Sequence, residues 1–149
     1  MLIFFYGNDI KKKKEERSSV LKNLKKQRPN SSFLHLDFLN ISESKLNELI
    51  ITEGSLFEKK NIILLTNIFY DKNFKKIFLN KIKDIADSNN AFILDEDEIN
   101  DIDLIKIKKN SFKFFDFSKK HKKKFNIFLL SNDLQKKKLK VYGLIITLL

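Results

Sequence analysis

The residues that could bind phosphate follow the first apolar run of the chain. That run, Leu2–Tyr6, leads into Gly7-Asn8-Asp9 and then into four lysines. A nucleotide-binding α/β domain places a glycine-rich loop and a helix N-terminus at this point. The phosphate-loop pattern GxxxxGK[ST] does not occur in this sequence, and Asp9 would put a carboxylate where the anion belongs. We therefore predict that Asn8 or Asp9 caps a helix and that the segment binds no nucleotide.

A second segment with acidic residues, Phe92-Ile93-Leu94-Asp95-Glu96, resembles a Walker B motif. In that motif an apolar strand ends in a magnesium-binding acid and a catalytic glutamate. RecA-like ATPases carry it on their third strand, whereas the third apolar segment here runs into Thr66 and Asn67. Without a phosphate loop the acids have no nucleotide to act on. We interpret residues 95–98 as a solvated loop and predict no paired-carboxylate catalysis there.

Other catalytic and metal-binding chemistry finds little support. The chain has no cysteine, and its two histidines, His35 and His121, start no metal-ligand spacing and follow no nucleophile elbow. We expect His35 to be a structural or exposed side chain. The sequence thus predicts a protein without metal, cofactor or catalytic residues of its own.

The net charge of +11 comes mostly from the end of the chain. Residues 1–110 hold 20 basic and 17 acidic groups, while residues 111–149 hold 10 and 2. Lys, Ile, Phe and Asn are encoded by A- and T-rich codons. Genome composition is therefore an alternative explanation of the positive charge, one that requires no nucleic-acid partner. A lysine run around His121 could contact a DNA backbone or form the solvated face of a helix. The candidate DNA contacts are Lys119, Lys120, Lys122, Lys123 and Lys124.

The spacing of apolar segments predicts the fold. Runs typical of buried strands start near residues 2, 33, 61, 91 and 113, and amphipathic helical patterns fill most intervals. We expect helices over about 10–27, from Ser42 or Ser44 to Gly54, and along one face from Phe74 to Ile85. This alternation indicates an α/β fold with a parallel five-stranded sheet between two helical layers. After residue 118 the pattern changes to helices, so we divide the chain into residues 1–118 and 119–149.

The absence of cysteine and of a signal-peptide pattern favours a cytoplasmic protein. A chain of 149 residues can form about one domain with a substantial core. The first apolar run is too short, and lacks the basic flank, for a signal peptide. The apolar run over 141–149 is too short to cross a bilayer, so we predict no membrane association.

An apolar pair stands out in the connection before the third strand. Ser55-Leu56-Phe57 precedes the basic pair Lys59-Lys60, at a place where polar residues are expected. Large apolar residues in such a connection either pack beneath the sheet or are displayed for a partner.

Four local patterns in this order resemble the delta subunit of the bacterial DNA polymerase III clamp loader. They are the strand into Phe5-Tyr6-Gly7-Asn8-Asp9, the element Ser55-Leu56-Phe57 before Lys59-Lys60-Asn61 and an aliphatic strand, an apolar fourth strand, and Lys124-Phe125-Asn126-Ile127-Phe128. The resemblance covers about residues 2–135, and the Ser-Leu-Phe element is its most specific part.

The resemblance implies a RecA/AAA+-like domain without a phosphate loop over residues 1–118 and the start of a helical lid domain over 119–149. It implies a non-catalytic subunit of the polymerase III holoenzyme that binds the sliding clamp (the beta subunit) and opens its ring during DNA replication. Leu56 and Phe57 would then be the clamp anchors, and Ser55 would shape their presentation. The implied partners are the loader's ATPase subunits, delta-prime and, through the complex, primed DNA.

One departure from the family affects assembly. Members continue through a complete lid and a collar domain that holds the loader together, whereas this sequence stops at Leu149. We therefore expect either a truncated or frame-shifted product or a shortened version, and incorporation into a loader stays open. The alternative hypothesis is a small basic nucleic-acid-binding domain without clamp contact, which would use the lysine run at 119–124.

Overall fold

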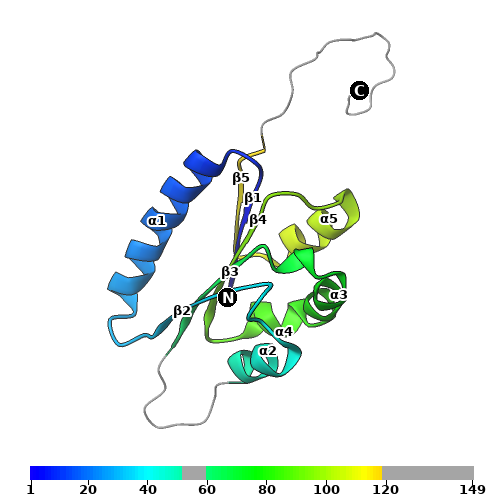
Figure 1. The fold of residues 1–149 in the computed structure, drawn as a ribbon. Coiled ribbons are helices and arrows are strands. Elements are labelled where there is room, and N and C mark those ends of the chain that lie inside the picture. The colour runs from blue at the N-terminus through cyan, green and yellow to red at the C-terminus, as the bar shows by residue number, and fades with distance from the viewer. Residues whose placement is uncertain (52–59, 119–149) are drawn as a thin grey trace. The chain divides into compact units, whose positions relative to one another are not determined.

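A five-stranded, all-parallel sheet forms the centre of the molecule (Figure 1). The computed structural model describes residues 1–51 and 60–118. The strand order is β2-β3-β4-β1-β5, with every neighbouring pair parallel. This confirms the predicted parallel sheet and its five strands. The strands are β1 (Leu2–Tyr6), β2 (Phe33–Asp37), β3 (Ile62–Thr66), β4 (Ala91–Glu96) and β5 (Lys113–Asp116).

Helices cover both faces of the sheet, unequally. Among the helices within residues 1–51 and 60–118, α1 covers one face by itself and the others lie on the opposite face (Figure 1). Crossovers between parallel strands are right-handed, so the direction of travel decides the face. The chain moves one way along the sheet from β1 to β2 and the opposite way in every later crossover. The helices are α1 (Ile10–Gln27), α2 (Glu43–Ile50), the 3-10 turn η1 (Ile68–Tyr70), α3 (Lys72–Asn80), α4 (Ile82–Asp87) and α5 (Asp101–Asn110).

The sheet separates two hydrophobic cores. Side chains that alternate along each strand point to opposite faces, so Phe4 and Leu94 belong to the larger core under α2 to α5. Phe5 and Ile93 belong to the smaller core under α1. All four are fully buried, as expected for the central strands of a doubly covered parallel sheet.

Two helix predictions need correction, and one further helix is absent from the predictions. The face from Phe74 to Ile85 is divided into α3 and α4, because the chain leaves helical geometry at Lys81. Helix α2 begins after Ser42, as predicted, but ends at Ile50 rather than at Gly54. There the side chains of Asn90 and Ser88 donate to the last carbonyls of α2, which closes the helix end. Helix α5 was not predicted, since its sequence alternates acids, lysines and isoleucines without a clear apolar face.

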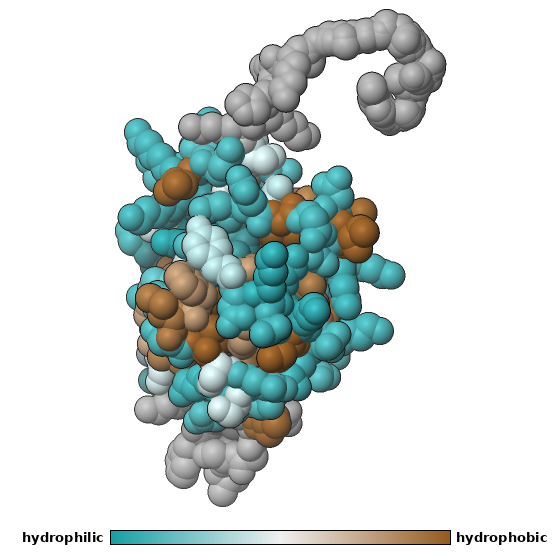
Figure 2. All heavy atoms as spheres, turned by 45° about the vertical axis from the view of Figure 1, so that its right-hand side comes forward, coloured by the Kyte–Doolittle hydropathy of each residue, from teal (hydrophilic) through white to brown (hydrophobic). Residues whose placement is uncertain are grey.

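The surface over the helical face is mixed in character. Figure 2 shows it as mostly hydrophilic, with separate hydrophobic spots rather than one continuous patch. Scattered apolar side chains of this kind are normal on protein surfaces. Within residues 1–51 and 60–118, no helix has the length and apolar character needed to cross a bilayer.

Candidate functional site

The place where an α/β sheet of this kind would hold a ligand lies between β1 and β4. Ligands bind outside the carboxyl ends of the strands, where neighbouring strands send their connections to opposite faces. Strands β1 and β4 are neighbours, and the chain leaves β1 for α1 on one face and β4 for α5 on the other. We call this end of the sheet the carboxyl edge, and it is the candidate site.

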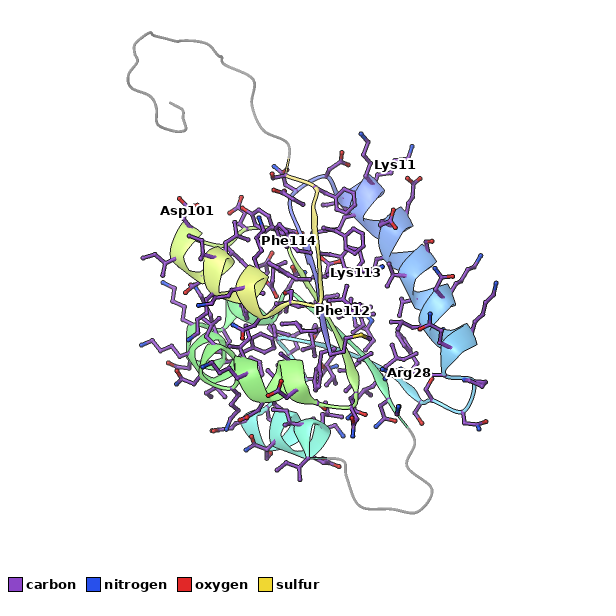
Figure 3. The ribbon with its side chains drawn as sticks, turned by 180° about the vertical axis from the view of Figure 1, so that it is seen from behind. Lys11, Arg28, Asp101, Phe112, Lys113 and Phe114 are labelled. Atoms are coloured by element: carbon purple, nitrogen blue, oxygen red, sulfur yellow. The ribbon has the colours of Figure 1, made fainter. Side chains whose placement is uncertain are left out.

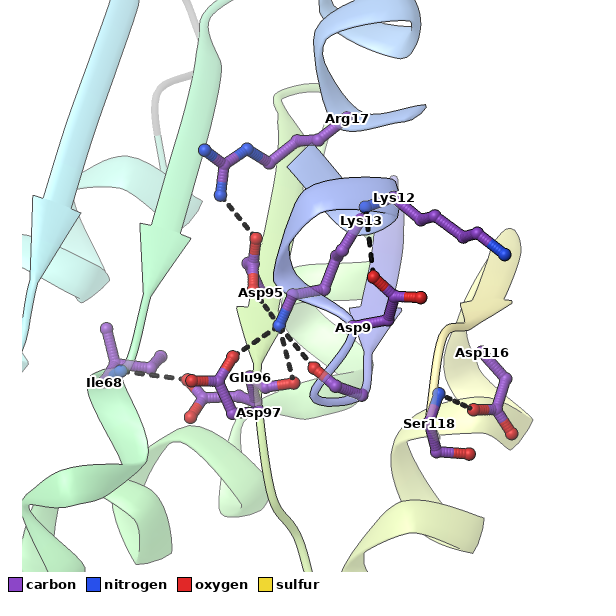
Figure 4. Close-up of polar contacts among 11 residues, drawn as sticks. Asp9, Lys12, Lys13, Arg17, Ile68, Asp95, Glu96, Asp97, Asp116 and Ser118 are labelled. Atoms are coloured by element: carbon purple, nitrogen blue, oxygen red, sulfur yellow. Dashed lines mark hydrogen bonds and ion pairs between the residues drawn. The ribbon is translucent and has the colours of Figure 1, made fainter. Parts of the chain in front are cut away.

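The amine of Lys13 lies at this ligand position, which we call the crevice (Figure 4). Lys13 Nζ lies 2.9 Å from Asp95 Oδ1 and 2.5 Å from Asp97 Oδ1. It also donates to the carbonyl of Gly7 at 2.7 Å and, at 3.4 Å, to that of Glu96. Lys13 is 3% exposed, so the ammonium group is satisfied entirely by protein oxygens rather than by water.

Arg17 completes the ion cluster from one turn further along α1. Its guanidinium bonds Asp95 Oδ2, so the two oxygens of this buried carboxylate receive Lys13 and Arg17 separately. We name Lys13, Arg17, Asp95 and Asp97 the Lys13 cluster. Its two cations and two anions balance, as a buried charged group requires.

Glu96, the last residue of β4, is the buried acid beside this cluster. Its Oε2 accepts a hydrogen bond from the backbone N–H of Ile68 at 2.9 Å. Burial, at 2% exposure, raises the pKa of Glu96 to about 8, and the neighbouring charges of Asp95 and Asp97 act in the same direction. The hydrogen bonds from Ile68 and Phe69 oppose this rise. Glu96 is therefore largely protonated at neutral pH and is enclosed rather than aimed into a cleft.

The helix terminus beside the crevice is also closed. Asp9 caps α1 by accepting from the backbone N–H of Lys12 at 3.3 Å, which confirms the cap prediction. Its own N–H donates to the carbonyl of Phe117 at 3.0 Å. Gly7 has φ +124°, and a Cβ atom there would collide with the backbone of Phe117 and Ser118. The glycine is thus explained by the close approach of the chain after β5, without a phosphate.

No protein-family model, curated protein or solved structure matches this chain. Among the described residues, no group of three or more His, Cys, Asp or Glu side chains is placed to hold a metal ion.

The predicted binding residues lie outside the described part of the chain. This applies to Ser55, Leu56 and Phe57, and to the lysines of the run 119–124 with His121. The structure describes their attachment points, the end of α2 at Ile50 and the end of β5 at Asp116. His35 is exposed on β2 and its Nε2 lies 2.9 Å from the hydroxyl of Thr66, in agreement with a structural or exposed role.

The interpretation of residues 95–98 as a solvated loop is wrong for its first half. Strand β4 continues through Glu96, and Asp95 and Glu96 are 5% and 2% exposed. For Asp95 the physical reason is its pairing with Lys13 and Arg17 on α1, which the strand sequence alone does not reveal. Glu96 is buried as a largely protonated acid that accepts from the N–H of Ile68. A signal was present in the spacing of Lys13, Arg17, Val20 and Leu24, which continues one helix face from charged to apolar residues.

Proposed function

We propose that this chain is a non-catalytic, delta-type module of a replication clamp loader that binds the sliding clamp and helps to open its ring. The Lys13 cluster, which occupies the ligand position of the parallel sheet, supports the non-catalytic part of the proposal. The clamp-binding part rests on the sequence element Ser55-Leu56-Phe57 and the family resemblance that it carries. A sheet with this closed crevice suits a RecA/AAA+-like domain that has a structural and binding role. We propose that nucleotide hydrolysis belongs to partner subunits and that residues 119–149 begin a helical lid.

The proposed clamp contact lies in the connection between α2 and β3. That connection leaves α2 at Ile50 and enters β3 at Ile62, so it attaches to the sheet at the opposite end from the Lys13 cluster. In the proposal Leu56 and Phe57 are the anchors and Ser55 shapes their presentation.

The energetics of such a contact are sufficient for a specific interaction. Aromatic and aliphatic anchors that fill a pocket contribute about 2 kcal/mol or more each when they act as hot spots. If the chain binds the open ring better than the closed ring, this difference shifts the ring equilibrium without nucleotide hydrolysis by this subunit.

The test is a calorimetric titration of the full chain against the sliding clamp of the same organism. The double variant Leu56→Ala with Phe57→Ala should weaken binding by at least about 30-fold. The matched control is Leu39→Ala with Ile102→Ala, which removes two apolar side chains that are each 80% exposed in the described structure. The control should bind like the parent chain.

The salt dependence distinguishes the alternative hypothesis. Clamp binding through apolar anchors should change little between low and physiological salt, whereas DNA binding through the lysine run should fall steeply. The proposal fails if the anchor variant binds the clamp as tightly as the parent. Strong salt-dependent binding of duplex DNA without clamp binding would favour the nucleic-acid-binding domain.

A further inference from the structure

A cavity of about 360 Å³ lies at the other end of α1, between the C-terminal half of that helix and the starts of β1 and β5. We call this end of the sheet the amino edge. Figure 3 shows Arg28 beyond the last turn of α1 and Phe112 and Lys113 at the start of β5. The volume lies within the range of small-molecule sites, roughly 300–1,000 Å³.

The cavity has an apolar wall that belongs to the smaller core. Ile3 and Leu24 are buried members of that core, and Val20 packs against it from α1. Phe112 borders the opening and is 68% exposed. These side chains would receive the apolar body of a ligand, and the exposed ring of Phe112 could cover it.

The charged groups at the cavity are all positive. Arg28 Nη1 donates to the carbonyl of Asn89 at 3.0 Å, which orients the guanidinium and leaves its other N–H groups available. Lys113 pairs in register with Ile3 and makes no ion pair with the described residues. Among the described residues that line the cavity, none is a carboxylate, and the amides of Asn23 and Gln27 add neutral donors.

The orientation of α1 determines where an anion can lie. The carbonyl end of a helix carries partial negative charge and disfavours anions close to its axis. The head group of a ligand should therefore lie on the β5 side, beside Lys113, with its body against the wall formed by Val20 and Leu24.

We propose that this cavity binds a small amphipathic anion, in which a carboxylate or phosphate monoester contacts Lys113 and an aromatic or aliphatic body fills the apolar part. The proposal is independent of clamp binding, because its residues lie on α1, β1 and β5 rather than in the connection before β3. The variant Leu56→Ala with Phe57→Ala should keep the cavity ligand.

The experiment is a calorimetric titration of the full chain with three probes of similar shape: naphthoate, naphthyl phosphate and the neutral naphthamide. We expect one molecule of anionic probe per chain, bound about tenfold more tightly than naphthamide, because a charge-assisted hydrogen bond to Lys113 is stronger than the neutral one that naphthamide can make. The ratio between the carboxylate and the phosphate probe identifies the preferred head group. Lys113→Gln should abolish the advantage of the anions and keep naphthamide binding.

Two controls make the result decisive. Lys109→Gln removes the same charge from an exposed position on α5 and should leave all affinities unchanged. Val20→Phe should fill the cavity and block both charged and neutral probes, with folding checked by circular dichroism. Equal affinity for naphthoate and naphthamide, or equal losses in the two lysine variants, would overturn the proposal. The proposal would also be overturned if the parent chain bound a DNA duplex and Lys113→Gln abolished that binding, because Lys113 would then be a nucleic-acid contact.

Discussion

Helix α1 places cations at both edges of the sheet, and their surroundings differ. At the carboxyl edge Lys13 and Arg17 contact Asp95 and its neighbour Asp97, and the crevice is closed. At the amino edge Arg28 lines a cavity with Lys113 of β5 and no described carboxylate. Lysine and arginine are therefore paired with carboxylates at the carboxyl edge, whereas at the amino edge they line a cavity without a described carboxylate.

The difference originates in β4 rather than in α1. Strand β4 carries Asp95 and Glu96 at its carboxyl end and begins with Ala91 at its amino end. A lysine in contact with a buried acid is desolvated and fixed, whereas a lysine without one keeps its capacity for an external anion. We therefore expect ligand binding at the amino edge, where the lysine has no described carboxylate partner, and a rigid structural role at the carboxyl edge, where the charges are paired.

Breaking the Lys13 cluster should give the largest effect on stability. Lys13→Met leaves Asp95 and Asp97 without their shared cation, and removing one partner of a buried pair costs about 3–5 kcal/mol. The urea midpoint should fall accordingly, while Lys14→Met, at an exposed neighbouring position, should change it little. Adding Asp95→Asn to Lys13→Met should recover part of the loss. Equal midpoints for the two methionine variants would contradict the cluster's role.

Glu96 should give the fold a distinctive pH dependence. Its folded pKa of about 8 lies above the ordinary 4.5, so the folded state binds the proton more tightly than the unfolded state. The protonated acid therefore gives full stability below pH 4.5, and stability falls as the pH rises toward 8. At pH 7 the loss amounts to about 3 kcal/mol, at about 1.4 kcal/mol per pH unit.

Glu96→Gln should remove this loss, because the amide keeps an acceptor for the N–H of Ile68 and does not ionise. Urea unfolding between pH 5 and 8 measures the effect. The free energy of unfolding of the variant, relative to that of the parent chain, should increase as the pH rises. Glu98→Gln is the matched control at an exposed site on the same segment and should retain the parent profile. A parent profile without this decline would show that Glu96 is ionised in the fold.

Much of the fold could be predicted from the sequence because its periodic signals are strong. The central strands are continuous apolar runs, and α1 begins at a clear cap and ends before Pro29. Helix α5 was missed because it buries Ile107 but leaves Ile102 and Ile105 exposed, so its apolar residues do not mark one face. The strand order was not predicted, since local patterns do not specify which strands are neighbours.

The closed crevice was harder to predict than the fold. The missing phosphate loop indicated that no nucleotide binds, but it did not show what replaces one. Burial of Asp95 depends on Lys13 and Arg17, which are 82 and 78 positions distant in the sequence. A lysine-rich helix offers many candidate partners, and the choice among them depends on the register of α1 over the sheet.

Substitutions of Asp9, which caps the N-terminus of α1 at the carboxyl edge, should have a smaller effect on stability. Asp9→Ala removes the acceptor for the N–H of Lys12 and should cost about 1 kcal/mol of folding free energy. Asp9→Asn keeps an equivalent cap and should be nearly neutral. Thermal or urea unfolding of both variants checks this, and a large cost for asparagine would mean that the charge of Asp9, rather than its cap, matters.

The smallest stability effect is expected at the amino edge, and it completes the comparison. Lys113→Gln should change the free energy of unfolding by no more than about 0.5 kcal/mol, because Lys113 is exposed and leaves no buried partner behind. Lys13 lies on α1 and contacts the sheet, and Lys113 lies on β5 on the side that α1 covers. Since both are lysines, side-chain type cannot explain a large difference between them. If Lys113→Gln costs as much as Lys13→Met in the same urea titration, the amino edge contains a matched charge after all, and its cavity is a structural feature. A small change in the free energy of unfolding would agree with a Lys113 ammonium group that has no buried partner and can bind an anion from solution.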